Sequence, residues 1–292
     1  MPAPQSGAGA TSDGANLHPI LFDFGFFQLP TYGVLLVTAL LTAIYTVVRQ
    51  GKREGLDSGR LLDFSTWLIV VALLGAKVLM VLTDWRFYWE HPSELVSRST
   101  LLAGGVFYGG FIAAVFFAVW YTRVYRLPMW KVFDVYAPSI ALGLGIGRLG
   151  CFAAGCDYGK PTTSALGVVF TNPFAHEVAG TPLGIPLHPT QIYESLACFL
   201  IFAILVWSYR AKQYDGQIFL RYITLYAVAR FGIEFLRGDA DRGFVFNHLL
   251  STSQFIALLA LGAAAGLYWY LRTSRRERAV GETGIPAVKR AR

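Results

Sequence analysis

Charged residues are scarce in this sequence. Only 15% of the 292 residues are Asp, Glu, Lys or Arg, whereas 54% are hydrophobic and the mean hydropathy is +0.47. Soluble globular domains contain about 25% charged residues, so this chain lacks the side chains that a large water-facing surface needs. Because the apolar residues gather in long runs, the composition favours a polytopic membrane protein over two soluble domains.

Cysteine is also rare, and its spacing matters more than its number. Cys151, Cys156 and Cys198 contain no CxxC pair, so they do not match a zinc site and we expect no metal. Cys198 lies in an apolar run and is interpreted as a small buried residue. Cys151 and Cys156 are either a disulfide or two small packed residues, and the spacing alone does not decide between them.

Two further features are missing from the chain. The net charge is +7, yet no basic cluster is interleaved with aromatics in a polar segment, which argues against nucleic acid as a partner. The first thirty residues lack the basic cluster of a signal peptide, and no convincing cleavage site follows the first apolar run. We therefore expect the first apolar helix to be retained.

Long apolar segments are what the chain has in abundance. Each is close to the roughly 20 residues that a helix needs to cross the hydrocarbon, and seven are present: 30–48, 61–82, 104–122, 133–150, 190–209, 217–236 and 251–271. They predict an all-α membrane protein, a polytopic bundle of about seven transmembrane helices. We expect a flexible tail over 1–28, a transmembrane domain over 29–272 and a basic cytoplasmic tail over 273–292.

The distribution of Lys and Arg predicts the orientation of this bundle. With the N-terminus outside, the inner segments contain 17 of the 25 basic residues and the outer segments contain 6. Basic residues concentrate on the cytoplasmic side of membrane proteins, so the chain is expected to be N-out and C-in. The longest outer connection, residues 151–189, then forms a small periplasmic head between the fourth and fifth spans, with a short strand in GVVFTN (167–172).

Ionisable residues inside or at the ends of the spans are few, and each needs a partner or a ligand because burial in the membrane is costly. They are Lys77, Arg148, Glu194, Arg230, Glu234 and Arg237. Most fall at the outer ends, so we expect them to converge near the outer leaflet. Three arginines against two glutamates leave excess positive charge, which suits a bound phosphate. The alternative is that the arginines simply neutralise the two glutamates.

Tyrosines and one histidine flank this zone. Tyr32 opens the first span, Tyr108 lies within GGVFYGG, and Tyr226 precedes Arg230 by one helical turn. Tyrosines near a membrane surface are usually interfacial anchors, but we expect Tyr108 and Tyr226 to serve the site. His188, before a proline, is either a proton carrier or a structural hydrogen-bond donor.

Glycines are spaced along several spans. The run GIGRLG at 145–150 spells GxGxxG, but no strand precedes it and no βαβ unit surrounds it, which argues against a dinucleotide site. Like Gly105 with Gly109, and Gly262 with Gly266, these glycines are interpreted as sites of close helix packing.

An ordered series of motifs covers most of the chain: Tyr32-Gly33, GAK at 75–77, GGVFYGG at 104–110, GIGRLGCF at 145–152, HPTQIYE at 188–194 and LYAVARFGIEFLRGDAD at 225–241. Single motifs are modest, but the series in this order on seven spans is specific. It resembles the prolipoprotein diacylglyceryl transferases of bacterial inner membranes.

The resemblance implies an activity and its surroundings. The family transfers the diacylglyceryl group of phosphatidylglycerol to the lipobox cysteine thiol in the signal-peptide region of a prolipoprotein, forming a thioether. It implies a multi-pass protein of the inner membrane, with its active site toward the periplasm, and no metal or other cofactor. The partners are those two substrates and the lipid bilayer. A secondary transporter or channel for an anion, and an inactive homologue that binds lipid or lipoprotein, stay open as alternatives.

The resemblance also implies roles for residues at matching positions. Arg148 would hold the lipid phosphate, with Arg230 as a second essential arginine and Tyr32 and Tyr226 as functional tyrosines. Gly159 matches the closing glycine of the family signature. The further residues expected to bind substrate are His188, Glu194, Glu234 and Arg237.

The chain departs from the family at four positions. Tyr108 stands where the family usually has histidine, Cys151 where it has asparagine, Cys156 where it has glutamate, and Lys77 where it has arginine. A proposed base and a carboxylate are therefore both missing from their usual positions. The candidates for the base in this chain are Tyr108, Asp157 and His188.

Overall fold

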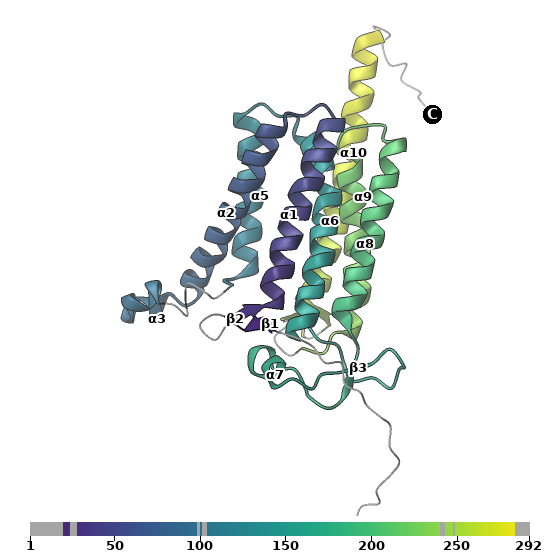
Figure 1. Ribbon diagram of the computed structural model, residues 1–292. Coiled ribbons are helices and arrows are strands. Elements are labelled where there is room, and N and C mark those ends of the chain that lie inside the picture. The colour runs from purple at the N-terminus through teal and green to yellow at the C-terminus, as the bar shows by residue number, and fades with distance from the viewer. Residues whose placement is uncertain are drawn as a thin grey trace, which may run out of the picture. The chain divides into compact units, whose positions relative to one another are not determined.

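Helices make up most of the chain. The computed structural model describes residues 20–23, 28–97, 100, 104–239, 243–247 and 249–283 (Figure 1). Within these residues, six helices are long and apolar enough to cross a membrane: α1 (Thr31–Arg53), α2 (Ser58–Thr83), α5 (Phe107–Val124), α6 (Met129–Ala154), α8 (Thr190–Ser208, continued by the 3₁₀ turn η2, Tyr209–Ala211) and α10 (Thr252–Thr283). The chain is thus an all-α polytopic membrane protein, as predicted. The remaining predicted span corresponds to α9 (Gln217–Ile233), which has only 17 residues.

The chain divides into two units, one made of residues 1–43 and 137–292 and the other of residues 44–136. Helices α1 and α6 each pass from one unit into the other. In the unit of residues 44–136, α2 packs along α5 (Figure 1). This unit also contains the short helices α3 (Trp85–Glu90) and η1 (Pro92–Val96).

Close contact between α2 and α5 depends on glycine. A Cβ atom added to Gly109 would lie 2.3 Å from the Gly75 carbonyl oxygen, and one added to Gly105 would lie 2.8 Å from the Ala76 backbone. The packing interpretation is therefore confirmed for Gly105 and Gly109. It is wrong for Gly262 and Gly266, since an added Cβ there meets no described atom within 4 Å.

In the unit of residues 1–43 and 137–292, α8, α9 and α10 lie side by side (Figure 1). A buried cluster of Ala137, Ala141, Ile201, Leu205 and Ile218 joins α6 to α8 and α9. The Ser195 hydroxyl donates a hydrogen bond to the Gly145 carbonyl oxygen at 2.8 Å. This bond fixes α8 against α6 near the end where the candidate site residues lie.

The connection between α6 and α8 has a small core of its own. Strand β3 (Val168–Val169) pairs antiparallel with β4 (Pro186–Leu187), and the helix α7 (Pro173–Ala179) begins at the Asn172 cap. Phe170 and Leu187 are fully buried in this core. The segment is therefore a folded substructure, with a strand inside the predicted GVVFTN.

Short elements complete the fold. Strand β1 (Ile20–Asp23) pairs with β2 (Gln28–Pro30), the 3₁₀ turn η3 (Glu234–Leu236) follows α9, and β5 (Phe244–Val245) pairs with β6 (Leu250–Ser251). Residues 1–19 and 24–27 of the predicted N-terminal tail, and residues 284–292 of the predicted basic tail, lie outside the described residues. Helix α10 runs to Thr283, well beyond the predicted end of the last span near residue 271.

Candidate active site

Arg148 lies in the second-last turn of α6, and its side chain is only 16% exposed. Its Nη1 atom lies 2.7 Å from Asp157 Oδ2, and its Nε atom lies 3.1 Å from Glu194 Oε2. The Cys151 sulfur lies 3.9 Å from Nη1. A buried guanidinium is thus held between two carboxylates from different parts of the chain, as an intramembrane charge requires.

Glu194 connects three elements. It stands on α8 with its side chain 4% exposed, and its Oε1 accepts a hydrogen bond of 2.8 Å from the Tyr226 hydroxyl of α9. Its Oε2 also lies 3.8 Å from Arg230 Nη1. Arg230 in turn pairs with Glu234 at 2.9 Å and donates a hydrogen bond to Ser253 of α10 at 3.1 Å.

Arg237 extends this arrangement beyond the end of α9. Its Nη2 atom lies 2.6 Å from Asp157 Oδ1, and its guanidinium also pairs with Asp239. Asp157 therefore bridges Arg148 and Arg237, one guanidinium on each oxygen. We refer to these ion-paired side chains as the arginine network: Arg148, Asp157, Glu194, Arg230, Glu234, Arg237 and Asp239.

The charge balance of the arginine network differs from the sequence prediction. The expected excess of positive charge counted two glutamates, but Asp157 and Asp239 join them, so four carboxylates face three guanidinium groups. Fully ionised, the network has one net negative charge, and the prediction of excess positive charge was wrong. The pairing of the arginines with Glu194 and Glu234, which was the alternative, is present.

The loop that contains Asp157 is held from two sides. The first turn of α8 holds one side, where the Thr190 hydroxyl donates to the Asp157 carbonyl oxygen at 2.7 Å and the Gln191 amide donates to that of Cys156 at 2.6 Å. On the other side, Gly159 N donates to the His188 carbonyl oxygen at 3.0 Å and forms a bridge with Arg237. An added Cβ at Gly159 would lie 2.4 Å from that oxygen, so only glycine fits.

The electrostatics of Asp157 follow from its two partners. Burial raises the pKa of the Asp157 carboxyl, but the charges of Arg148 and Arg237 outweigh this effect and hold the pKa below its usual range. Burial lowers the pKa of the Arg237 guanidinium. Its hydrogen bond to Asp239 and the charge of Asp157 outweigh this effect, so the pKa is raised overall. Asp157 and Arg237 therefore stay charged near neutral pH, and Asp157 is a poor proton acceptor.

The two cysteines beside Arg148 are free thiols in the structure. This favours two small packed residues over a disulfide. Together with Asp157 they offer three ligand atoms within 4.8 Å of one another. Both Asp157 oxygens are already occupied by guanidinium groups, which would also repel a bound cation, so the group does not fit a metal site. The hydrogen bond with Cys151 and burial raise the pKa of the Cys156 thiol, which therefore does not replace a carboxylate.

Four other residues singled out in the sequence do not belong to the arginine network. The Tyr32 ring, at the start of α1, lies against Gly150 of α6, where an added Cβ would lie 3.1 Å from it. His188 supports the loop through its backbone, and its Nδ1 lies 3.3 Å from the Tyr193 hydroxyl.

Tyr108 belongs to the unit of residues 44–136, at the start of α5, and its ring contacts Phe107. Lys77, in the same unit, donates to the Thr100 carbonyl oxygen at 2.5 Å.

Comparison with known proteins identifies the family of this chain. The family model for prolipoprotein diacylglyceryl transferase matches residues 19–270. The chain belongs to the prolipoprotein diacylglyceryl transferase family. Among relatives, the phosphatidylglycerol–prolipoprotein diacylglyceryl transferase of Clostridium tetani is 37% identical over 246 residues, which cover 84% of this chain and 94% of that protein. That of Bacillus licheniformis is 31% identical over 265 residues, covering 89% and 95%.

The complete arginine network lies within the part of the chain that matches the transferase family. Sequence reasoning missed Asp239, Ser253 and Gln191 as members or supports of this site. Asp239 and Gln191 lie inside the motifs LRGDAD and HPTQIYE, so their motifs were recognised but their roles were not. Ser253 lies in an apolar span outside the quoted motifs, and only its distance to Arg230 reveals it.

Proposed function

We propose that this chain transfers the diacylglyceryl group of phosphatidylglycerol to the lipobox cysteine thiol of prolipoproteins. The observation that supports this most directly is the arginine network, in which three guanidinium groups line one end of α6, α8 and α9 in a member of the transferase family. A phosphate-bearing lipid is the substrate that such groups recognise best, because guanidinium matches phosphate oxygens two at a time.

The lipid phosphate would take the place of Asp157. Asp157 is the most exposed carboxylate of the network at 30%, compared with 17% for Asp239, 4% for Glu194 and 1% for Glu234. It also sits between Arg148 and Arg237 as an anion already paired with both. If Asp157 swings out, a phosphate fits the same two guanidinium groups, and the network keeps its charge close to balance.

The transfer itself needs a thiolate nucleophile and a stabilised leaving group. The lipobox thiolate attacks the glycerol carbon, the C–S bond forms, the C–O bond to phosphate breaks, and glycerol phosphate leaves with the electron pair. Arg148 and Arg237, which would hold the phosphate, and Arg230, which shares Glu194 with Arg148, would stabilise the charge that builds on the phosphate. In a site of low dielectric this stabilisation is worth several kcal/mol. The thiol proton goes to a base, for which we retain Tyr108 and His188 and set Asp157 aside because of its lowered pKa.

The surroundings of the site complete the proposal. We place the chain in a bacterial inner membrane with seven spans, α9 included, the N-terminus outside and the C-terminus inside. The segment between α6 and α8 then forms a periplasmic head, and the arginine network faces the outer leaflet, where the lipobox of a translocated signal peptide is found. The division into a tail over 1–28, a membrane domain over 29–272 and a basic tail over 273–292 belongs to the same proposal.

A transfer assay with purified protein tests this function. Labelled phosphatidylglycerol and a lipobox peptide are incubated with the wild-type chain, Arg148→Gln, Arg230→Gln and, as a control outside the network, Arg86→Gln. We expect thioether product with the wild type and the control, and at least about a hundredfold lower kcat for the two network variants. A chain that binds phosphatidylglycerol yet forms no thioether would instead be an inactive lipid-binding homologue. Anion flux in proteoliposomes without thioether formation would indicate a transporter.

A further inference from the structure

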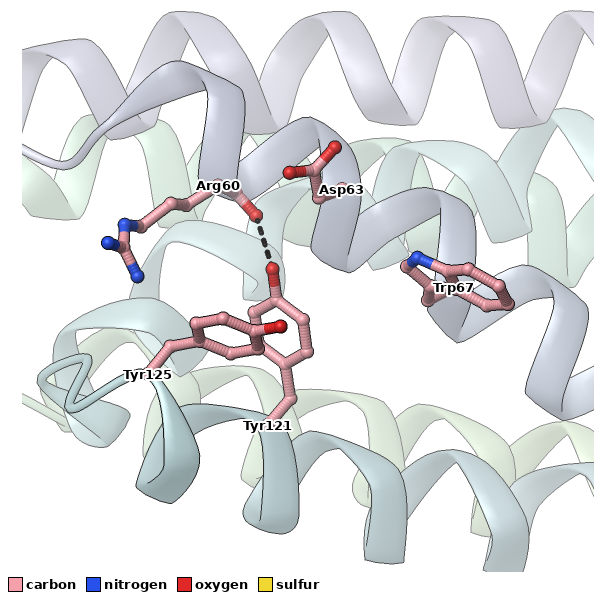
Figure 2. Close-up of a pocket in the computed structure, with 5 residues that line it drawn as sticks. All are labelled: Arg60, Asp63, Trp67, Tyr121 and Tyr125. Atoms are coloured by element: carbon pink, nitrogen blue, oxygen red, sulfur yellow. Dashed lines mark hydrogen bonds between the residues drawn. The ribbon is translucent and has the colours of Figure 1, made fainter.

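A separate polar cavity lies in the unit of residues 44–136, between the start of α2 and the end of α5. It has a volume of about 330 Å³ and is lined by Arg60, Asp63, Trp67, Tyr121 and Tyr125 (Figure 2). None of these residues belongs to the arginine network, and none has a role in the proposed transfer. The cavity therefore lies outside the site already described.

The floor of the cavity is aromatic and fixed by packing. Tyr121 is 4% exposed, and its hydroxyl donates a hydrogen bond to the Arg60 carbonyl oxygen at 3.4 Å (Figure 2). The ring centroids of Tyr121 and Tyr125 lie 4.3 Å apart, and the buried Phe64 ring lies 5.0 Å from that of Tyr121. Because these rings support one another, the floor exists before any ligand arrives.

The two charged side chains that line the cavity have opposite signs and do not pair with each other. Arg60 and Asp63 are three residues apart on α2, a spacing at which ion pairs commonly form, but their side chains leave the helix in different directions (Figure 2). The guanidinium lies 5.5 Å from the Tyr125 ring centroid. Within the described part of the chain, the Asp63 carboxylate makes no hydrogen bond or ion pair. The cavity thus presents a separate cation and a separate anion above aromatic rings.

The cavity opens at the ends of two membrane helices. Helix α2 begins at Ser58, two residues before Arg60, and α5 ends at Val124, beside Tyr125. Trp and Tyr are enriched at this level of a membrane, where the lipid head groups lie. In the proposed orientation, this end of the helix pair faces the cytoplasmic leaflet.

We propose that this cavity binds the head group of a zwitterionic aminophospholipid. The lipid phosphate would pair with the Arg60 guanidinium, and the ammonium would pair with the Asp63 carboxylate and lie against the faces of the tyrosine rings. A phosphate and an ammonium joined by two carbons can reach two opposite charges that stand on one helix without pairing with each other. Phosphatidylglycerol has the phosphate but no ammonium, so the cavity discriminates against the lipid proposed as substrate.

Native mass spectrometry of the delipidated full chain in detergent tests this proposal. The probes are short-chain phosphatidylethanolamine, short-chain phosphatidylglycerol and soluble phosphoethanolamine. The variants are Arg60→Gln and Asp63→Asn, both of exposed side chains. The control is Arg86→Gln, since Arg86 lies 5.7 Å from the Trp85 ring and provides the same kind of contact outside the cavity.

We expect the wild type and the control to bind one phosphatidylethanolamine about tenfold more tightly than phosphatidylglycerol. Asp63→Asn should remove this preference, and Arg60→Gln should weaken both lipids. Equal wild-type affinity for the two lipids, or an unchanged preference in Asp63→Asn, would overturn the proposal and leave Arg60 and Trp67 as interfacial anchors. Binding of soluble phosphoethanolamine as tight as that of the lipid would also contradict it. All these proteins, the one called wild type included, also carry Arg148→Gln, so that phosphatidylglycerol bound at the arginine network does not contribute to the measured affinities. Transferase activity does not enter this test, and the two proposals fail separately.

Discussion

At the scale of single residues, Asp157 has the most informative environment in the arginine network. Its backbone has φ = 60°, in the left-handed region that few non-glycine residues adopt but that Asp and Asn tolerate. Its carboxylate is paired on both oxygens by Arg148 and Arg237. The substitution Asp157→Asn therefore removes the charge without disturbing the backbone, which makes it a clean probe of the proposed exchange with phosphate.

The first prediction concerns substrate affinity. If the lipid phosphate displaces Asp157, then Asp157→Asn removes a competing anion and should lower the KM for phosphatidylglycerol several-fold. Steady-state transfer kinetics measure this effect, with Glu177→Gln as a control, since Glu177 is an exposed residue of α7 that takes no part in the network. A KM that is unchanged or raised would argue that Asp157 holds the arginines for substrate and does not compete with it.

The second prediction concerns pH. Because the folded pKa of Asp157 is held below its unfolded value, its ion pairs stabilise the protein fully above the ordinary carboxyl pKa of about 3.9. This contribution is lost as the pH falls through the lowered folded value. We expect the thermal midpoint of Asp157→Asn to lie below that of the wild type by a constant amount from about pH 5 to pH 8, and the gap to close below about pH 4. A gap that widens on acidification would contradict the prediction.

The third prediction concerns Tyr226, whose hydroxyl donates to the buried Glu194. Tyr226→Phe removes this donor and leaves the buried Glu194 oxygen without its hydrogen bond, which should lower the free energy of unfolding by about 1–3 kcal/mol. Tyr222, whose ring stacks on that of Tyr226, is a matched control because its hydroxyl makes no hydrogen bond to a described residue. In detergent, the thermal midpoint of unfolding should fall clearly for Tyr226→Phe and change little for Tyr222→Phe.

At the scale of elements, glycines with the same spacing in the sequence have different functions. Gly109 allows α5 to contact the backbone of α2, whereas the surroundings of Gly262 in α10 are open. Both glycines lie in apolar helices that are long enough to cross a membrane, so local sequence does not separate these cases. Only the position of the neighbouring backbone does.

The fourth prediction uses these two glycines as a pair. Gly109→Ala places a methyl group 2.3 Å from the Gly75 carbonyl oxygen, so α2 and α5 must separate and the thermal midpoint should fall. Gly262→Ala meets no described atom and should be neutral or stabilising, by up to about 1 kcal/mol of helix propensity. Equal effects of the two substitutions would show that the α2–α5 contact is not close.

At the scale of the whole molecule, α9 determines whether the chain has six or seven spans. It has 17 residues, fewer than the roughly 20 that cross a typical bilayer, but η3 continues it to Leu236. Its side chains Tyr226 and Arg230 belong to the site between α8 and α10. In the proposed arrangement α9, packed between α8 and α10, is the seventh span.

The fifth prediction tests the number of spans and the orientation together. In a cysteine-free background, single cysteines at Ser164, Gln213 and Asn247 are exposed to an impermeant thiol reagent added from outside. With seven spans and an outer N-terminus, Ser164→Cys and Asn247→Cys should react and Gln213→Cys should not. If α9 does not cross, positions 213 and 247 lie on the same side and should react alike.

The helices and the family could be predicted from local features of the sequence. Apolar runs near 20 residues can satisfy their backbone in a membrane only as helices, so six of the predicted spans appear in the structure. Five of them lie within about five residues of their expected ends, and α10 continues to Thr283. The ordered motifs likewise identified the transferase family, which the comparisons show. Both kinds of information are local and can be read along the chain.

The charge of the site, in contrast, depends on contacts that form only in the folded chain. Asp157 and Arg237 are 80 positions apart and lie 2.6 Å from each other, and Asp239 joins them from beyond the helix end. Ionic interactions depend on distance in space, which the sequence does not specify once the chain leaves a helix. For this reason the count of three arginines against two glutamates predicted a positive site, whereas the folded chain contains a nearly balanced network in which Asp157 occupies the position proposed for the lipid phosphate.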